Sequence, residues 1–234
     1  MDGTTRKTLH PHRFPGESVD YRAARDRLLE EEVALRRHTE KVAQMRRALP
    51  AGGVAKDYVF EGVAGPIKLS ELFGPHDSLI TYHYMFGPER KAPCPMCTGI
   101  VGALASNAAD IEQRAALVVI GASPVARLEA FARERGWRHL RFVSDAGTSF
   151  ARDYFATIDG SEVPMFNVFR RDASDDGNGA IRHFWASEMS MVPSDPGQDE
   201  RTGDMLFPLW NALDLTPAGR GTGWYPKLSY PAGR

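Results

Sequence analysis

Two cysteines separated by two residues constrain this chain more than any other feature of its sequence. Cys94-Pro95-Met96-Cys97 follows a continuous apolar and aromatic run, 79–86, and precedes a stretch of small, helix-compatible residues. An apolar run of this length between turn residues is typical of a buried strand. A C-x-x-C pair at a strand–loop–helix junction is the setting that dithiol chemistry requires. The sequence therefore predicts an α/β fold with this pair at the start of a helix.

The count of cysteines narrows the chemistry of the pair, because the 234 residues contain no others. A framework of structural disulfides uses more cysteines, spread along the chain. A tetrahedral zinc site needs two further ligands, and His83, His139 and His183 show no ligand spacing with the pair. Two idle buried thiols, or a zinc half-site completed by another subunit, remain the alternatives. We expect no metal and no cofactor, since the glycines of 219–223 do not form a phosphate loop.

Charge and hydropathy exclude several classes of partner. The net charge is −1, so the chain has no global basic excess for nucleic acid. No stretch is apolar for long enough to span a bilayer, and we expect no membrane partner. The polar N-terminus leads into no hydrophobic run, which predicts the absence of a secretory signal. These features together predict a cytoplasmic protein.

The order of predicted elements defines the fold class. Strands are expected at 58–60, 67–69, 79–86, 117–120, 140–143, 165–169 and 181–185. A helix follows the cysteines, a second has Ser123 as its N-cap and Pro124 at its first position, and a third follows Asp145. This β-α-β-α-β order, closed by a hairpin, predicts a mixed sheet flanked by helices.

We expect three parts along the chain: an arm and long helix in 1–50, a core in 51–191, and an irregular extension in 192–234 that packs on the core. The helix, over 18–49, carries apolar residues at seven-residue spacing. It either packs along its own domain or crosses to a second subunit in a homodimer. The aromatic tail, with Trp210, Trp224 and Tyr225, is expected to pack on its own core; a dimer contact or a lid is the alternative.

The position of the pair predicts different roles for its two sulfurs. Free N–H groups at a helix start favour a thiolate on the cysteine that precedes the helix. We therefore expect Cys94 to attack and Cys97, one turn later, to resolve the mixed disulfide. Arg90 is a candidate for stabilising the Cys94 thiolate by its charge. His83 is either a core histidine or a proton-transfer group for Cys97.

These residues resemble a known family. The stretches that carry the resemblance are Tyr58-Val59-Phe60, Leu69-Ser70-Glu71-Leu72-Phe73, Tyr82-His83-Tyr84-Met85-Phe86-Gly87-Pro88, Cys94-Pro95-Met96-Cys97 and Leu209-Trp210-Asn211-Ala212-Leu213-Asp214-Leu215-Thr216-Pro217-Ala218-Gly219-Arg220-Gly221. Together with the long N-terminal helix, they are similar to a bacterial thioredoxin-like family of unknown function, described as predicted dithiol-disulfide oxidoreductases. The resemblance covers nearly the whole chain.

The resemblance implies a thioredoxin-like fold, in a peroxiredoxin-like variant, and thiol–disulfide exchange as the activity. In such folds a proline before the strand of the hairpin is cis and lies against the dithiol. We therefore expect a cis bond at Val163-Pro164 and a substrate groove formed by Pro95, Met96, Val163 and Pro164. The partners would be a protein or small-molecule thiol or disulfide and an electron donor that the sequence does not identify.

Two other activities remain open. The first is a thiol peroxidase that uses the same pair, although the peroxidatic pattern of Pro and Thr or Ser, seven and three residues before the reactive cysteine, is missing. Gly87 and Lys91 occupy those places before Cys94, and Arg90 and Cys94 occupy them before Cys97. The second is a binding module in which the fold is kept and the cysteines are idle.

Overall fold

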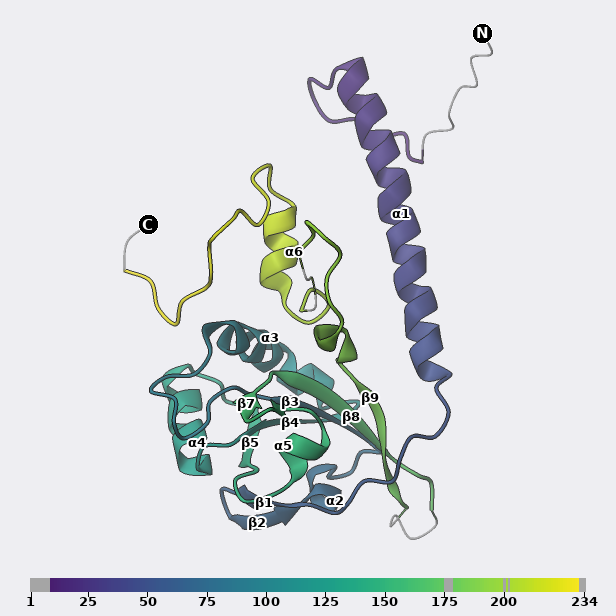
Figure 1. Cartoon of the computed structure of the whole chain (residues 1–234). Helices are drawn as coiled ribbons and strands as arrows, with labels where there is room; N and C mark the ends of the chain where they lie inside the picture. The colour runs from purple at the N-terminus through teal and green to yellow at the C-terminus, as the bar shows by residue number, and fades with distance from the viewer. Residues whose placement is uncertain (1–8, 175–178, 200, 202, 232–234) are drawn as a thin grey trace. The chain divides into compact units, whose positions relative to one another are not determined.

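The computed structural model describes residues 9–174, 179–199, 201 and 203–231 (Figure 1). The chain divides into two units, Met1–Pro50 and Ala51–Arg234. In the first unit the predicted long helix is confirmed as α1 (Val19–Arg47), and the Ser18 hydroxyl accepts a hydrogen bond of 3.1 Å from the Tyr21 backbone N–H as its N-cap. The helix ends just before Pro50, whose ring removes a backbone donor.

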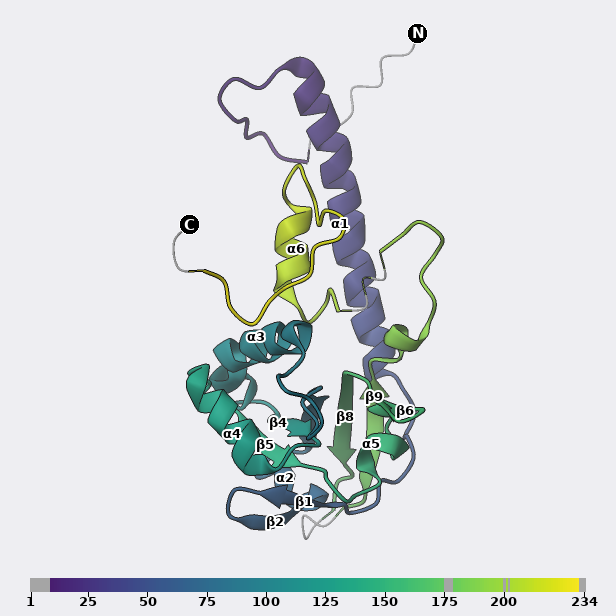
Figure 2. The same cartoon turned by 60° about the vertical axis from the view of Figure 1, so that its left-hand side comes forward.

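Seven strands of the described residues form one mixed sheet in the second unit (Figures 1 and 2). They are β1 (Val59–Gly62), β2 (Gly65–Lys68), β3 (Ser78–His83), β4 (Ala116–Gly121), β5 (Arg141–Ser144), β8 (Met165–Arg171) and β9 (Ile181–Ala186). Their order across the sheet is β2-β1-β5-β4-β3-β8-β9. The strands β3, β4 and β5 are parallel, whereas β8 pairs antiparallel with β3 and then with β9.

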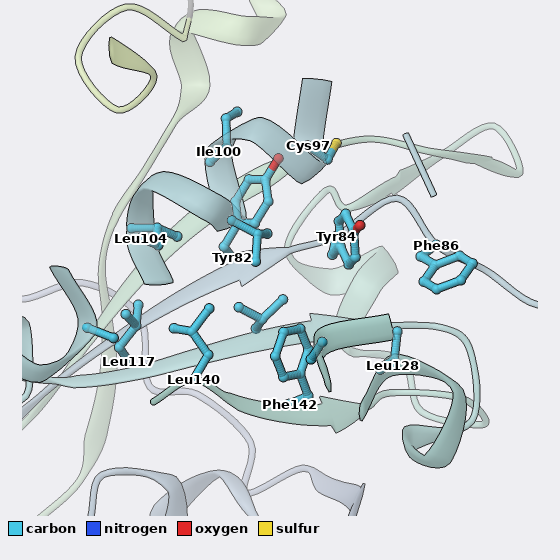
Figure 3. Close-up of a cluster of buried hydrophobic side chains, with 14 of the residues drawn as sticks. Tyr82, Tyr84, Phe86, Cys97, Ile100, Leu104, Leu117, Leu128, Leu140 and Phe142 are labelled. Carbon is cyan, nitrogen blue, oxygen red and sulfur yellow. The ribbon is translucent and has the colours of Figure 1, made fainter. Parts of the chain in front are cut away.

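Helices cover both faces of this sheet (Figure 2). They are α2 (Leu69–Leu72), α3 (Pro95–Ile111), α4 (Val125–Glu134) and α5 (Phe150–Asp153). The 3-10 turn η1 (Glu188–Met191) and the helix α6 (Pro208–Asp214) follow the last strand. The helices α3 and α4 pack on one face through a cluster that includes Tyr82, Tyr84, Ile100, Leu128 and Phe142 (Figure 3). The helices α2 and α5 pack on the other face, over a cluster that alternates with the first along each strand.

The predicted thioredoxin-like fold, in its peroxiredoxin-like variant, is therefore confirmed. The helix that begins with the cysteines follows β3, which lies between β4 and the antiparallel pair β8–β9 in the sheet. Several predicted boundaries differ, and two of them concern segments near the cysteine loop. The strand at 79–86 ends at His83, and the chain then turns toward the cysteines, with the Phe86 N–H bonded to the Tyr84 carbonyl at 2.7 Å. The N-cap of α4 is Pro124, while the buried Ser123 hydroxyl accepts from Arg127.

The expectation of a cis bond at Val163-Pro164 is wrong, because the described residues contain no cis peptide bond. A short hairpin, β6 (Thr157–Ile158) and β7 (Ser161–Glu162), precedes Pro164 and is absent from the sequence-based prediction. The Val163 N–H donates to the Ala156 carbonyl at 2.9 Å, which joins Val163 to this hairpin. The chain thus enters β8 through the trans form that X–Pro bonds ordinarily favour.

The C-terminal extension is anchored on α3. Phe207, at the start of α6, is buried in the cluster beneath α3, and its ring lies where a side chain at Gly99 would be. Trp210 packs edge-on against Phe207 and against Trp224, with ring centroids 6.2 and 5.8 Å apart. A glycine in the first turns of α3 therefore lets the tail approach the helix that carries the cysteines.

Two kinds of feature are absent from the described residues. No helix among them is both long and apolar enough to cross a membrane. No group of three or more histidine, cysteine, aspartate or glutamate side chains in the same part of the chain is arranged to hold a metal ion.

Candidate active site

The backbone of Cys94 is held at the junction between β3 and α3. Cys94 is the N-cap of α3, and Pro95 begins the helix. The Cys94 N–H donates to the Met85 carbonyl at 3.1 Å, and the Thr98 N–H and hydroxyl both donate to the Cys94 carbonyl at 2.9 Å. The Thr98 hydroxyl lies 2.7 Å from that of Tyr84. Because the Thr98 hydrogen is directed at Cys94, the Tyr84 hydroxyl is the donor in this second bond.

The two thiols are free and lie in different environments. Cys94 is half-buried, whereas Cys97 is 1 % exposed. A hydrogen bond from the Cys97 side chain is the main reason that the pKa of Cys94 is lowered to about 5, although burial acts in the opposite direction. The backbone N–H groups of Cys97 and Met96 at the helix start lower this pKa further. The same bond with Cys94, and then burial, raise the pKa of Cys97. The site thus separates a thiolate from a protonated thiol.

Tyr82 reaches from β3 to the buried thiol. Figure 3 shows its ring rising from the strand toward α3, with the hydroxyl on the side of Ile100 and Cys97. Burial raises the pKa of Tyr82 well above its ordinary value, so the hydroxyl stays protonated and lowers the pKa of Cys97 against the larger opposing effects. Strand alternation predicted that only one of the pairs Tyr82/Tyr84 and His83/Met85 would face the site, without saying which.

His83 lies on the other face of β3. Its Nε2 is 3.0 Å from Asp145 Oδ2, and both side chains are almost fully buried. Since the neighbouring Tyr82 points toward Cys97, His83 points away from it. His83 is therefore buried in the core beside Asp145, on the face of β3 opposite to Cys97, which favours the interpretation as a core histidine.

Two arginines organise the loop that leads to Cys94. Arg90 pairs with Glu162 through its Nε, and this bond, more than the nearby charge of Cys94, raises the pKa of Arg90. Arg127, on α4, donates to the carbonyls of Gly87 and Pro88 at 3.2 and 3.3 Å and to that of Arg90. The predicted Arg90 thus lies in the field of the Cys94 thiolate, whereas no sequence pattern pointed to Arg127.

The predicted substrate-groove residues do not all come together. Met96 and Pro164 line one cavity beside α3, and Tyr225 of the C-terminal extension lines it too. Pro95 is part of the first helical turn. Val163 is not among the residues that line the cavity, and its N–H is bonded within the β6–β7 connection.

Tyr225 is the site residue that sequence reasoning did not assign to the thiols. Its hydroxyl lies 3.6 Å from Cys94 Sγ, across 131 positions of the chain. Burial, and then its contact with Cys94, raise the pKa of Tyr225, so the phenol remains a donor to the thiolate. An aromatic residue in a Gly- and Pro-rich tail carries no periodicity that would place it at a distant cysteine.

Replacing Tyr225 with phenylalanine is expected to raise the pKa of Cys94. The change removes one donor and leaves the ring and the N–H groups of α3 in place. A bond to a charged group contributes roughly 1.5–3 kcal/mol when buried, and less at this half-exposed site, so we expect the midpoint to rise by up to about one pH unit. The measurement is the pH dependence of iodoacetamide alkylation at Cys94. Tyr230→Phe is the matched control, because the Tyr230 hydroxyl accepts from the Lys227 N–H instead; an equal shift in both variants would contradict the assignment.

The chain resembles several solved structures of low sequence identity. A hypothetical protein from Sinorhizobium meliloti 1021 is 20% identical with a TM-score of 0.42, over 76% of this chain and 91% of that one. Peroxidoxin BcpB from Mycobacterium tuberculosis is 18% identical with a TM-score of 0.44, over 70% and 98%. The exposed lipoprotein thioredoxin Etrx1 from Streptococcus pneumoniae is 12% identical with a TM-score of 0.38, over 66% and 99%.

No curated protein matches the chain. A family model does match, over residues 11–230, and it describes bacterial proteins of unknown function. The match includes the cysteine pair, the strands on both sides of β3 and the aromatic tail that carries Tyr225. The chain therefore belongs to the DUF899 family of bacterial proteins of unknown function.

Proposed function

We propose that the chain is a thiol–disulfide oxidoreductase in which Cys94 attacks and Cys97 resolves. The observation that carries the proposal is the contrast between the two sulfurs at one helix start. Cys94 is accessible and accepts hydrogen bonds, whereas Cys97 is buried one turn away as a protonated thiol. This is the arrangement in which one sulfur attacks a disulfide and the other completes the exchange.

The exchange balances in two steps. The Cys94 thiolate attacks one sulfur of a substrate disulfide, forms a mixed disulfide and releases the other sulfur as a thiolate. Cys97 then loses its proton and attacks the Cys94 sulfur, which breaks the mixed disulfide and releases the second substrate thiol. Two electrons pass from the protein dithiol to the substrate, and an external thiol reductant must return them before the next turnover.

A redox titration tests the proposal directly. The purified protein would be equilibrated in glutathione buffers over a range of potentials, its free thiols trapped, and the products counted by mass spectrometry. We expect a single two-electron transition with a Cys94–Cys97 disulfide at the oxidising end. If the two thiols never pair, exchange by this mechanism is excluded and the binding-module alternative becomes the leading one. A peroxide-consumption assay on the same sample tests the thiol-peroxidase alternative.

The pH dependence of alkylation gives an independent prediction. Because the pKa of Cys94 is lowered to about 5, its thiolate forms as pH rises through that value. We expect iodoacetamide alkylation at Cys94 to increase with a midpoint near that pKa and to be flat across neutral pH, whereas Cys97 stays unmodified. An ordinary cysteine shows no such plateau, because its alkylation rate still rises between about pH 7 and pH 9. A midpoint near the ordinary value would contradict the proposed activation of Cys94.

A further inference from the structure

A cavity of about 340 Å³ lies beside the cysteine pair. Its apolar wall is formed by side chains from α3, β8 and the C-terminal extension, among them Met96, Ile100, Phe166, Phe207 and Trp210. This volume is at the lower end of the range for small-molecule sites, roughly 300–1,000 Å³. The cavity is therefore of a size for a ring-sized molecule and has an apolar surface to receive it.

The cavity also holds a buried polar group with unused hydrogen-bonding capacity. Tyr82 is 1 % exposed and lines the cavity. Its hydroxyl lowers the pKa of Cys97 as a hydrogen-bond donor does, but it forms no hydrogen bond of ordinary distance and angle with the described residues. A buried hydroxyl left without such a bond costs free energy, which a polar atom of a bound molecule would recover.

The end of the cavity formed by the extension is closed by charged side chains. Arg220 bonds to Asp214 at 2.8 and 2.9 Å, to Asp199 at 3.2 Å and to Asp204. Arg201 bonds to Asp204 and Asp214 at 3.2 and 2.8 Å. Of these residues, Asp214 does not line the cavity, and the charges of the four that do, Arg201, Arg220, Asp199 and Asp204, cancel. Both arginines are already bonded to aspartates, while the buried Oδ1 of Asp204 forms no hydrogen bond with the described residues. This end therefore offers a carboxylate acceptor and no free guanidinium, which favours a neutral or cationic molecule over one that carries a carboxylate.

The access to Cys94 also favours a small substrate over a polypeptide. Tyr225 lines the cavity and touches Cys94 Sγ, so one residue joins the cavity to the reactive sulfur. A peptide that paired with the backbone before Pro164 would need the Val163 N–H, which is already bonded to Ala156. The site thus offers a cavity for a compact molecule and no free backbone donor at Val163.

We propose that this cavity binds the body of a low-molecular-weight disulfide that carries a neutral or cationic, ring-sized apolar group. The inference rests on the exchange function proposed above and names its substrate class. The apolar ring lies against Met96, Ile100 and Phe166, and a ring heteroatom or polar substituent takes the free hydrogen-bonding position of Tyr82. The disulfide sulfur extends past Tyr225 to Cys94, where the two-step exchange described above proceeds unchanged.

The test compares a neutral aromatic disulfide with an anionic one. The probes are 4,4′-dithiodipyridine, which is neutral, and 5,5′-dithiobis(2-nitrobenzoic acid), which carries two carboxylates; both release a coloured thiol. The rate constants for their reaction with the reduced full-length protein would be divided by those for free mercaptoethanol thiolate. We expect this corrected ratio to favour the neutral probe by about tenfold or more, since each factor of ten needs only about 1.4 kcal/mol.

Two matched variants test whether the cavity causes the preference for the neutral probe. Ser190 is exposed and lines the cavity, so Ser190→Trp fills it without touching either thiol. Ser194 is also exposed but does not line the cavity, and Ser194→Trp is the control. We expect Ser190→Trp to abolish the preference for the neutral probe and Ser194→Trp to keep it. Alkylation of Cys94 by iodoacetamide, which is too small to need the cavity, should be the same in both variants.

The outcomes separate this inference from the function on which it rests. If Cys94 reacts with both disulfides but shows no corrected preference, or if both tryptophan variants lose it equally, the cavity is not the substrate site and the exchange function stands. If Cys94 reacts with neither disulfide while its alkylation is normal, the exchange function itself is overturned, and the substrate proposal with it.

Discussion

Replacing Cys94 with serine is expected to abolish the proposed disulfide reduction, with a loss of at least about a thousandfold in turnover, because the other described thiol, Cys97, is buried. Replacing Cys97 with serine stops turnover as well, but at a different step. In that variant Cys94 still attacks, and the serine hydroxyl still donates toward it, so a mixed disulfide accumulates in place of product. The measurement is mass spectrometry of each variant after reaction with a small disulfide.

The two cysteine variants test whether the protein has the activity and also show which sulfur attacks and which resolves. The Cys97→Ser protein should gain the mass of one substrate half, and the Cys94→Ser protein should gain none, since its remaining thiol is buried and protonated. The reverse pattern would exchange the attacking and resolving roles. Full activity in the Cys94→Ser protein would remove the dithiol from the function altogether.

Truncating Phe207 to alanine is expected to cost about 3–5 kcal/mol in the free energy of unfolding, the usual range for a buried phenylalanine. Phe207 is buried in the cluster beneath α3, at the close approach to Gly99. Its loss should also release the extension from α3, so that Tyr225 leaves Cys94 and proteases cut within 203–231. Denaturant unfolding and limited proteolysis measure the two effects on the same protein.

Leu215→Ala is the control for this variant, because Leu215 belongs to the same extension and is 87 % exposed. It should change the unfolding free energy by no more than about 0.5 kcal/mol and leave the protease pattern unaltered. If Phe207→Ala is destabilised but the extension stays protected, contacts other than Phe207 hold the tail on α3. If neither property changes, the anchoring assigned to Phe207 is wrong.

The central elements were predictable because their signals are local. Apolar runs such as 117–120 contain nearly all of a buried strand, and the observed β4 is only one residue longer at each end. The cap of α1 at Ser18 and the start of α3 at the cysteines follow from residues adjacent to each helix. The turn predicted over 172–179 includes 175–178, which lie outside the described residues, while its flanking strands are observed.

The parts that sequence reasoning missed depend on contacts between distant segments. The hairpin that precedes Pro164 consists of two two-residue strands, which are too short to give a periodic signal in the sequence. The hydrogen bonds from Arg127 to the loop before Cys94 join positions about 40 apart on different elements. The sequence predicts that the extension packs on the core and leaves a lid or a dimer contact as alternatives, because an irregular tail has no pattern that specifies its partner. The homodimer and the three-part division of the chain stay predictions.

The contact between Tyr225 and Cys94 has a consequence for how the protein is made. The ribosome synthesises Cys94 131 residues before the tyrosine whose hydroxyl contacts its sulfur. At roughly 5–20 residues per second, about 7–26 s of translation separate the two. The strands and helices that position the thiols all precede the extension, so the nascent core can place its two sulfurs before Tyr225 is added. During that interval Cys94 lacks the hydrogen bond from Tyr225 that lowers its pKa, so the activation of its thiol is completed only when the extension has been made.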